Sequence, residues 1–149
     1  MKPYAVNKKA RYDYLIQEDF EAGVVLFGHE VKAIRTGHVS LKASFVVIRG
    51  GEAYLLNSSI SPYQPKNTPK DYEPERSRKL LLNKKELTEL IGKTKEKGLT
   101  LVALKLYNKN GKIKLSIGVG KGKKKADKRE TLRARDMKRE VDRALREKG

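Results

Sequence analysis

Apolar and polar residues follow a strand-like rhythm through much of the first 120 residues. Residues 45–48 and 53–56 are short apolar runs on either side of Gly50 and Gly51. Glycine readily adopts the positive φ that a two-residue hairpin turn requires. The pattern predicts a β-hairpin over residues 45–56.

A second hairpin is predicted over residues 101–119, with its turn at Asn110-Gly111. On its return strand, apolar residues alternate with polar ones, so that one face is apolar and the other begins with Lys112 and Lys114. A strand face that carries lysines either faces solvent or binds an anionic partner. The hairpin alone does not distinguish these two interpretations.

One helix has clear start and stop signals. Asn83 is a typical N-cap, Glu86 follows three residues later as in a capping box, and Leu82 and Leu87 suit a hydrophobic staple. Gly98 follows a lysine-rich last turn, as at many helix C-termini. The pattern predicts a helix that begins after Asn83 and ends before Gly98.

The other segments are less regular. We expect two apolar runs joined by an acidic connector over residues 12–25, a strand over residues 28–35, and a short helix near residues 39–44. The segment between Ile60 and Arg78 contains four prolines and almost no aliphatic side chain, which predicts a long surface loop. Short strands with two hairpins and inserted helices favour a mainly β fold, an OB-like antiparallel β-barrel.

Charge adds a second part to this picture. The 149 residues contain 35 Lys+Arg and 18 Asp+Glu, a net charge of +17. Such an excess is most simply explained by a nucleic-acid partner. No apolar stretch is long enough to span a membrane, and the first residues lack the apolar core of a signal peptide. We therefore expect a cytoplasmic protein that binds RNA.

The basic charge is divided between two predicted regions, a barrel over residues 1–120 and a C-terminal tail over residues 121–149. The tail has 13 basic and 6 acidic residues, a net charge of +7 that leaves +10 for the barrel. Gly118, Gly120 and Gly122 predict a flexible exit from the last strand. The tail is expected to be disordered when free and helical on RNA, or else to be an exposed helix or solubility tail.

Little in the composition supports catalysis. Cysteine is absent, which excludes thiolate sites and cysteine nucleophiles. His29 and His38 are the only histidines, so a His-rich metal centre or a Ser-His-Asp triad has little material. A metal-dependent nuclease would have to use the acidic residues of the first segments, which are Asp13, Glu18, Asp19, Glu21 and Glu30. They show no recognisable ligand spacing. We predict a protein that is not an enzyme and needs no metal or cofactor.

Glu30 stands among basic residues in Gly28-His-Glu-Val-Lys-Ala-Ile-Arg35. One interpretation is that its carboxylate orients Lys32 or Arg35 by ion pairing. The other is that it accepts hydrogen bonds from base amino or imino groups of an RNA loop. Both remain open from the sequence.

Three blocks together resemble a known family. They are E-A-G-x-x-L-x-G-x-E-V-K at residues 21–32, R-K-L-L-L at residues 78–82 and G-K-K-x-x-D-K-R at residues 122–129. Their order and spacing resemble the SmpB family of SsrA-binding proteins, the partners of transfer-messenger RNA (tmRNA), across nearly the whole chain.

The resemblance implies a barrel that binds the tRNA-like domain of tmRNA (SsrA RNA) and delivers it to stalled ribosomes for trans-translation, which rescues the ribosome and tags the nascent peptide. The tail would occupy the decoding centre and the empty mRNA channel. We expect a monomer when the chain is free. The expected RNA-binding residues are Asn7, Lys9, Arg11, Glu30, Lys32, Arg35, Lys79, Asn83, Lys112 and Lys114.

The family's ribosome-directed tail motif matches Gly122, Lys123, Lys124, Asp127, Lys128 and Arg129. Where the family often has His or Tyr before Asp-Lys-Arg, this chain has Ala126. An aromatic stacking contact is therefore not expected at that position. The alternative to a tmRNA partner is an OB-fold ribosomal protein or translation factor that binds rRNA.

Overall fold

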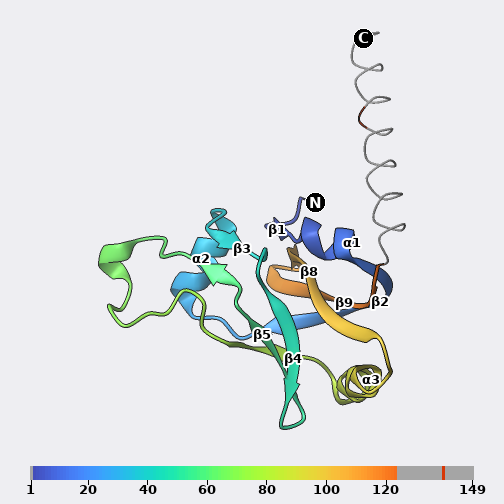
Figure 1. Ribbon diagram of the computed structural model, residues 1–149. Coiled ribbons are helices and arrows are strands. Elements are labelled where there is room, and N and C mark those ends of the chain that lie inside the picture. Colours follow the sequence, from blue (N-terminus) through green and yellow to red (C-terminus); the bar gives the residue numbers. More distant parts are fainter. Residues whose placement is uncertain (1, 124–138, 140–149) are drawn as a thin grey trace.

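The computed structural model describes residues 2–123 and residue 139, and the described part is a strongly curved antiparallel sheet with three α-helices (Figure 1). The helices are α1 (Lys8–Asp13), α2 (Gly28–Arg35) and α3 (Lys84–Thr94), with a 3-10 turn at Pro65–Asn67. The strands are β1 (Ala5–Val6), β2 (Tyr14–Val24), β3 (Val39–Ser40), β4 (Phe45–Arg49), β5 (Glu52–Leu56), β6 (Ser59–Ile60), β7 (Arg78–Leu81), β8 (Leu99–Lys109) and β9 (Lys112–Gly122).

The main sheet has the order β1-β8-β9-β2-β7-β5-β4, and β3 pairs separately with β6. The sheet curls so that β4 also lies against β8, although these two strands do not share a ladder. Curling brings one face of every long strand toward a common interior, as in a half-closed barrel. The predicted mainly β fold, an antiparallel barrel with inserted helices, is confirmed.

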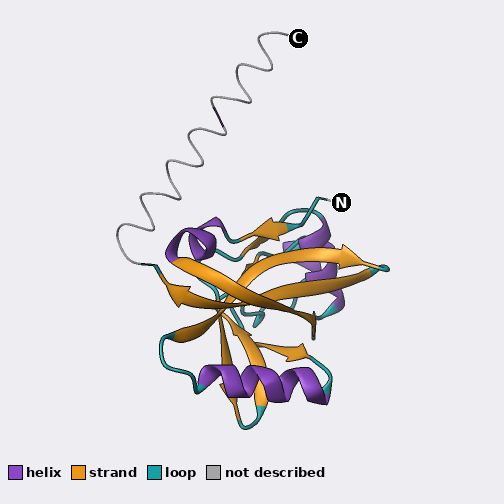
Figure 2. Cartoon of the chain, turned by 90° about the vertical axis from the view of Figure 1, so that its right-hand side faces the viewer, coloured by secondary structure: helices purple, strands orange, loops and turns teal. Residues whose placement is uncertain are grey.

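Both predicted hairpins are present, and their turns have the expected backbone. Gly50 and Gly51 have φ of 56° and 76°, and Asn110 and Gly111 have φ of 52° and 77°. Positive φ at both central residues is the type I′ geometry, which matches the twist of the flanking strands. The second hairpin, β8–β9, is the longest ladder of the sheet and crosses the whole molecule (Figure 2).

The predicted helix start at Asn83 is also confirmed. The side-chain oxygen of Asn83 accepts from the Glu86 backbone N–H at 2.8 Å, and the Asn83 amide donates to the Glu86 carboxylate at 2.6 Å. Leu90 is fully buried in the core, where Leu82 and Leu87 pack beside it. The helix ends at Thr94, and Gly98 follows with a φ of 82°.

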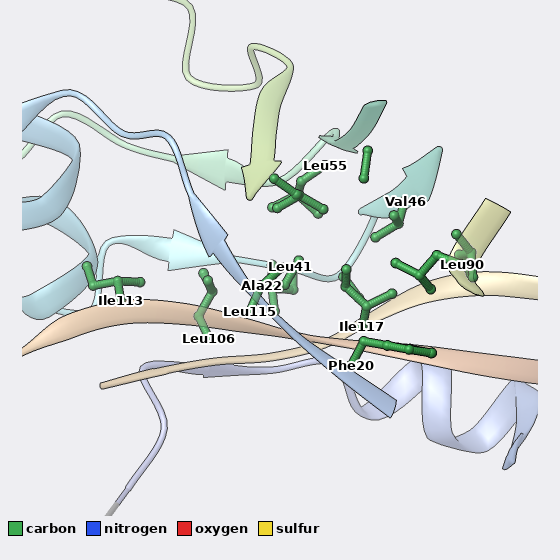
Figure 3. Close-up of a cluster of buried hydrophobic side chains, with 14 of the residues drawn as sticks. Phe20, Ala22, Leu41, Val46, Leu55, Leu90, Leu106, Ile113, Leu115 and Ile117 are labelled. Carbon is green, nitrogen blue, oxygen red and sulfur yellow. The ribbon is translucent and has the colours of Figure 1, made fainter. Parts of the chain in front are cut away.

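The core lies between the inner faces of the curved sheet, and Figure 3 shows aliphatic side chains and Phe20 meeting there. Ile117 and Leu115 of β9 meet Leu55 of β5 and Leu90 of α3 there, and each is at most 1% exposed. A smaller cluster on the outer face consists of Ala10, Val102 and Leu104, covered by α1.

Two strand predictions are corrected by the structure. The acidic residues expected to form a connector within residues 12–25 instead lie in β2, which runs from Tyr14 to Val24 with a register shift against β9 after Ile16. Phe20 and Ala22 of this strand face the core. Gly118 and Gly120 are not a flexible exit, because both are buried within β9. A Cβ at Gly118 would lie 2.9 Å from Leu104, so glycine there permits close packing.

Two local assignments are also wrong. Residues 28–35 form helix α2 rather than a strand, because Glu30, Ala33 and Ile34 are buried at helical spacing. Residues 39–44 form β3 and a turn rather than a helix, because Val39 pairs with Ile60 of β6. Residues 61–77, between β6 and β7, are the expected long loop with one 3-10 turn. None of the described helices is long and apolar enough to cross a membrane.

Candidate nucleic-acid interface

Three of the predicted basic residues meet in one place, which the sequence could not show. Arg35 at the end of α2 donates from Nη2 to the Gly111 carbonyl oxygen at 2.9 Å, so the helix end contacts the β8–β9 turn. Lys112 and Lys114 follow that turn, and all three side chains line the same hollow. The contact between helix and turn therefore gathers three cations on one surface.

Leu81 completes this surface; the family resemblance pointed to the region around Lys79 to Asn83 but did not single out this side chain. Its side chain is 53% exposed, although its neighbour Leu80 is 2% exposed and faces the core. Leu81 pairs with Gly23 across β7 and β2, and Gly23 pairs in turn with Lys114 of β9. The only signal in the sequence for an exposed Leu81 was the alternation of side chains along a strand, which places Leu81 on the opposite face from Leu80. We call Arg35, Leu81, Lys112 and Lys114 the hairpin patch.

Glu21 adds an acceptor two residues before Gly23 on the same strand. Its Oε2 accepts from the Tyr107 hydroxyl at 2.6 Å, and Lys109 forms an ion pair with its Oε1 at 3.1 Å. The Tyr107 hydrogen bond and the nearby lysines hold the pKa of Glu21 below its usual value. Burial and the Glu21 carboxylate raise the pKa of Tyr107. Glu21 therefore stays ionised beside the cations.

Glu30 has a different role from either that the sequence suggested. Its side chain is fully buried on α2, and it pairs with Arg76 and Arg78 rather than with Lys32 or Arg35. Oε1 accepts from the Phe27 backbone N–H at 2.8 Å and from Arg76 Nη2. With no exposed oxygen, Glu30 cannot reach a nucleobase in this conformation, and the prediction of a base contact is corrected.

Oε2 of Glu30 accepts from Arg78 Nη2 at 2.6 Å and Nε at 2.9 Å, from the Tyr72 hydroxyl at 3.0 Å and from Arg76 Nε at 3.1 Å. Burial alone raises the pKa of Glu30, but hydrogen bonds from Arg76, the Phe27 amide and Arg78 outweigh it and lower the pKa to about 2. Burial and the Glu30 carboxylate raise the pKa of Tyr72 to about 12. Glu30 is therefore ionised and Tyr72 protonated at neutral pH.

Arg78 is fully buried, and every nitrogen of its guanidinium is hydrogen-bonded. Nη1 donates to the carbonyl oxygens of Ser58 and Arg76 at 2.8 and 3.0 Å, and Nη2 donates to the Pro74 carbonyl at 2.9 Å. We call Glu30, Tyr72, Arg76 and Arg78 the arginine clasp. The arginine clasp fastens the proline-rich loop, residues 61–77, to α2. Because Glu30 is more than 40 residues from the other three members, the sequence did not predict that they would meet.

The remaining barrel residues of the predicted set lie elsewhere. Asn7 is 4% exposed and caps α1, since it accepts from the Ala10 N–H at 3.2 Å and donates to the Ala103 carbonyl at 2.9 Å. Its expected RNA contact is corrected to a structural role. Lys9 and Arg11 are exposed on α1, outside the hollow of the hairpin patch.

Lys79 and Asn83 flank the patch residue Leu81 along the chain but are engaged locally. Lys79 is exposed and lies 3.6 Å from Glu52, and Asn83 is the N-cap of α3. Lys32 is on α2 and lines a separate hollow with Tyr63. The predicted residues thus do not form a single surface.

The tail begins beside α1. β9 ends at Gly122, the Lys123 N–H donates to the Asp13 carbonyl at 2.8 Å, and Lys123 Nζ donates to the Arg11 carbonyl at 3.0 Å. Lys124, Asp127, Lys128, Arg129 and Ala126 lie outside the described residues, as does the expected tail helix. Within the described part of the chain, no three His, Asp or Glu side chains are grouped closely enough to hold a metal ion.

Comparison with known proteins identifies the family. The SmpB protein model matches residues 4–147. The chain is 58% identical to the SsrA-binding protein of Halalkalibacterium halodurans and 56% identical to that of Shouchella clausii, over 99% of this chain and 95% and 94% of those proteins. A solved structure described as "tmRNA-SmpB: a journey to the center of the bacterial ribosome" is 46% identical, with a TM-score of 0.65, over 86% of this chain and 93% of that one. The chain belongs to the SmpB family.

Proposed function

We propose that this protein binds the tRNA-like domain of tmRNA and delivers it to stalled ribosomes for trans-translation. The observation that carries the proposal is the hairpin patch, where an exposed leucine lies among three cations. Relatives named SsrA-binding proteins and a similar structure of SmpB with tmRNA support the same partner.

The chemistry of the hairpin patch suits structured RNA. Arg35, Lys112 and Lys114 neutralise phosphates, and such contacts position an RNA without reading its sequence. Leu81 offers an apolar surface to a base or sugar, and the ionised Glu21 is an acceptor for a base amino group. A surface that bound RNA by charge alone would need neither Leu81 nor Glu21.

The two regions of the chain have separate roles in this proposal. The barrel, predicted over residues 1–120 and continued by β9 to Gly122, holds the tRNA-like domain, while the tail beyond β9, up to residue 149, enters the decoding centre and the empty mRNA channel. Lys123, Lys124, Lys128 and Arg129 would contact rRNA there. The protein acts in the cytoplasm as a binding factor and not as an enzyme, and it is a monomer before it meets RNA.

A binding measurement with matched charge changes tests the proposal. In a salt series with the tRNA-like domain, the double variant Lys112→Ala/Lys114→Ala should weaken binding. The log–log salt slope should fall by about one for each phosphate that is no longer neutralised. Lys95→Ala/Lys97→Ala removes the same charge from exposed positions after α3 and is the control. Equal weakening by both double variants would contradict a specific site.

Sequencing of the RNA that copurifies with the protein separates this proposal from the rRNA-binding alternative. One dominant structured RNA supports the tmRNA partner, whereas all rRNAs in stable association would favour a ribosomal protein. Cleavage of RNA by the purified protein would overturn the prediction that it is not an enzyme.

A further inference from the structure

A second hollow borders α2, and nothing in the proposed function uses it. Lys32 of α2 lines it together with Tyr63, Gln64 and Asn67 of the proline-rich loop, and its volume is about 340 Å³. We call these four residues the Tyr63 hollow. Its size falls at the lower end of the roughly 300–1,000 Å³ usual for small-ligand sites.

The hollow presents an aromatic ring to solvent. Tyr63 is 40% exposed, and the His38 ring meets it edge-on with centroids 6.1 Å apart. His38 is itself held by a 2.9 Å hydrogen bond to the Thr36 hydroxyl. A supported, exposed aromatic ring is the usual platform on which proteins stack an unpaired base.

Two amides beside Tyr63 leave complementary groups available. Asn67 Nδ2 donates to Gln64 Oε1 at 2.8 Å, which fixes the pair to each other. Asn67 Oδ1 and Gln64 Nε2 then have no side-chain or backbone partner among residues 2–123, so the pair offers one acceptor and one donor. This is the combination with which amide side chains read the edge of a base.

Lys32 supplies the charge. It makes no ion pair with a described residue, so its ammonium group is available for a phosphate. On α2, Gly28 and Lys32 border the Tyr63 hollow, while Val31 and Arg35 border the hollow of the hairpin patch. Residues four apart lie on one helical row, so the two hollows flank adjacent rows of the same helix.

We propose that the Tyr63 hollow binds one unstacked nucleotide of the RNA that the hairpin patch binds. The base stacks on Tyr63, the Gln64–Asn67 pair meets its edge, and Lys32 contacts its phosphate. This inference rests on the proposed function, since it extends the same RNA surface across α2. The arginine clasp preorganises the hollow by fastening its loop to α2, which lowers the cost of ordering the site on binding.

The absence of tryptophan from the chain allows a direct test. Tyr63→Trp introduces a single indole whose emission reports stacking, while the anisotropy of end-labelled tRNA-like domain reports binding. We expect saturating quenching with the same midpoint as the anisotropy change. Tyr63→Phe should keep the affinity, and Tyr63→Ala should weaken it by about 5- to 150-fold, as expected for loss of one stacked base.

Phe45 is the matched control, because it is also 40% exposed but lies on β4 in a different hollow. Phe45→Trp should show no RNA-dependent quenching, and Phe45→Ala should keep the affinity. Normal RNA affinity without quenching of Tyr63→Trp would overturn the nucleotide site and leave the proposed function standing. Equal quenching of both indoles would also overturn it. Failure of the unaltered protein to select the tRNA-like domain would instead reject the proposed function.

Discussion

At the scale of single residues, the most consequential side chain is one that no solvent reaches. Glu30 is buried with Arg76 and Arg78, and its two oxygens accept from six donor groups. A buried ion pair is tolerable only when its charges and hydrogen bonds are satisfied together. The clasp meets this condition, so the buried charge stabilises one position of the proline-rich loop on α2.

Glu30→Gln should therefore destabilise the protein strongly, because it leaves the fully buried Arg78 without its counter-charge. We expect a loss of about 3–5 kcal/mol in the free energy of unfolding, measured with urea. Tyr72→Phe removes one hydroxyl from the same clasp and should cost only about 1 kcal/mol. Equal losses for both variants would show that the charge pair is not what holds the clasp.

The pKa of Glu30 gives this contribution a defined pH dependence. Because the folded pKa is lowered from 4.5 to about 2, the contribution is complete above pH 4.5 and is lost as the pH falls toward 2. The Glu30→Gln variant lacks this group, so its stability should fall less over that range. Parallel acid titrations of the two proteins would contradict this assignment.

Two neighbouring leucines are expected to have different roles, one in RNA binding and the other in the stability of the fold. Leu81 is 53% exposed and Leu80 is 2% exposed. Leu81→Ala should weaken RNA binding and change the free energy of unfolding by less than about 0.5 kcal/mol. Leu80→Ala should destabilise by about 2–5 kcal/mol. A Leu81→Ala variant with full RNA affinity would remove this residue from the interface.

At the scale of elements, β9 shows why glycine can strengthen a strand. A Cβ at Gly118 would lie 2.9 Å from Leu104 Cδ1, and one at Gly120 would lie 2.9 Å from Tyr14 Cβ. These glycines let the small cluster under α1 pack directly on the strand. The strand can then continue to Gly122 and carry the chain to Lys123 beside α1.

Gly118→Ala should overpack this cluster, at a cost of about 1–3 kcal/mol in unfolding free energy. Gly122→Ala is the matched control, because nothing lies within 4 Å of a Cβ at that position. Thermal or urea unfolding of the two variants measures the difference. A flexible exit at these glycines would instead predict small and equal effects.

At the scale of the whole molecule, the end of β9 determines where barrel and tail can be separated. Residues 120–122 pair with β2, so a cut after Val119 would remove part of the ladder. The structure therefore places a clean cut after Lys123. A chain ending at Lys123 should bind the tRNA-like domain, with a smaller salt slope, and should not support peptide tagging. Tagging by the shortened chain would refute the proposed role of the tail.

The local features of this protein were predictable from its sequence because their causes lie within a few residues. Gly50-Gly51 and Asn110-Gly111 determine their turns through positive φ, and Asn83 caps α3 through a partner three residues away. The net charge of +17 predicted an RNA partner, and the motif blocks predicted the family, because both can be read from the sequence without knowing how the chain folds.

What only the tertiary structure decided are the contacts between distant segments. Residues 28–35 were expected to form a strand but form a helix, and this helix buries Glu30 against Arg76 and Arg78, more than 40 residues away. Gly118 looks flexible until Leu104 packs on it. Leu81, next to the buried Leu80, is turned outward by the curved sheet and lies beside Lys114. Apolar burial and charge pairing depend on position in space, and folding alone brings these side chains together.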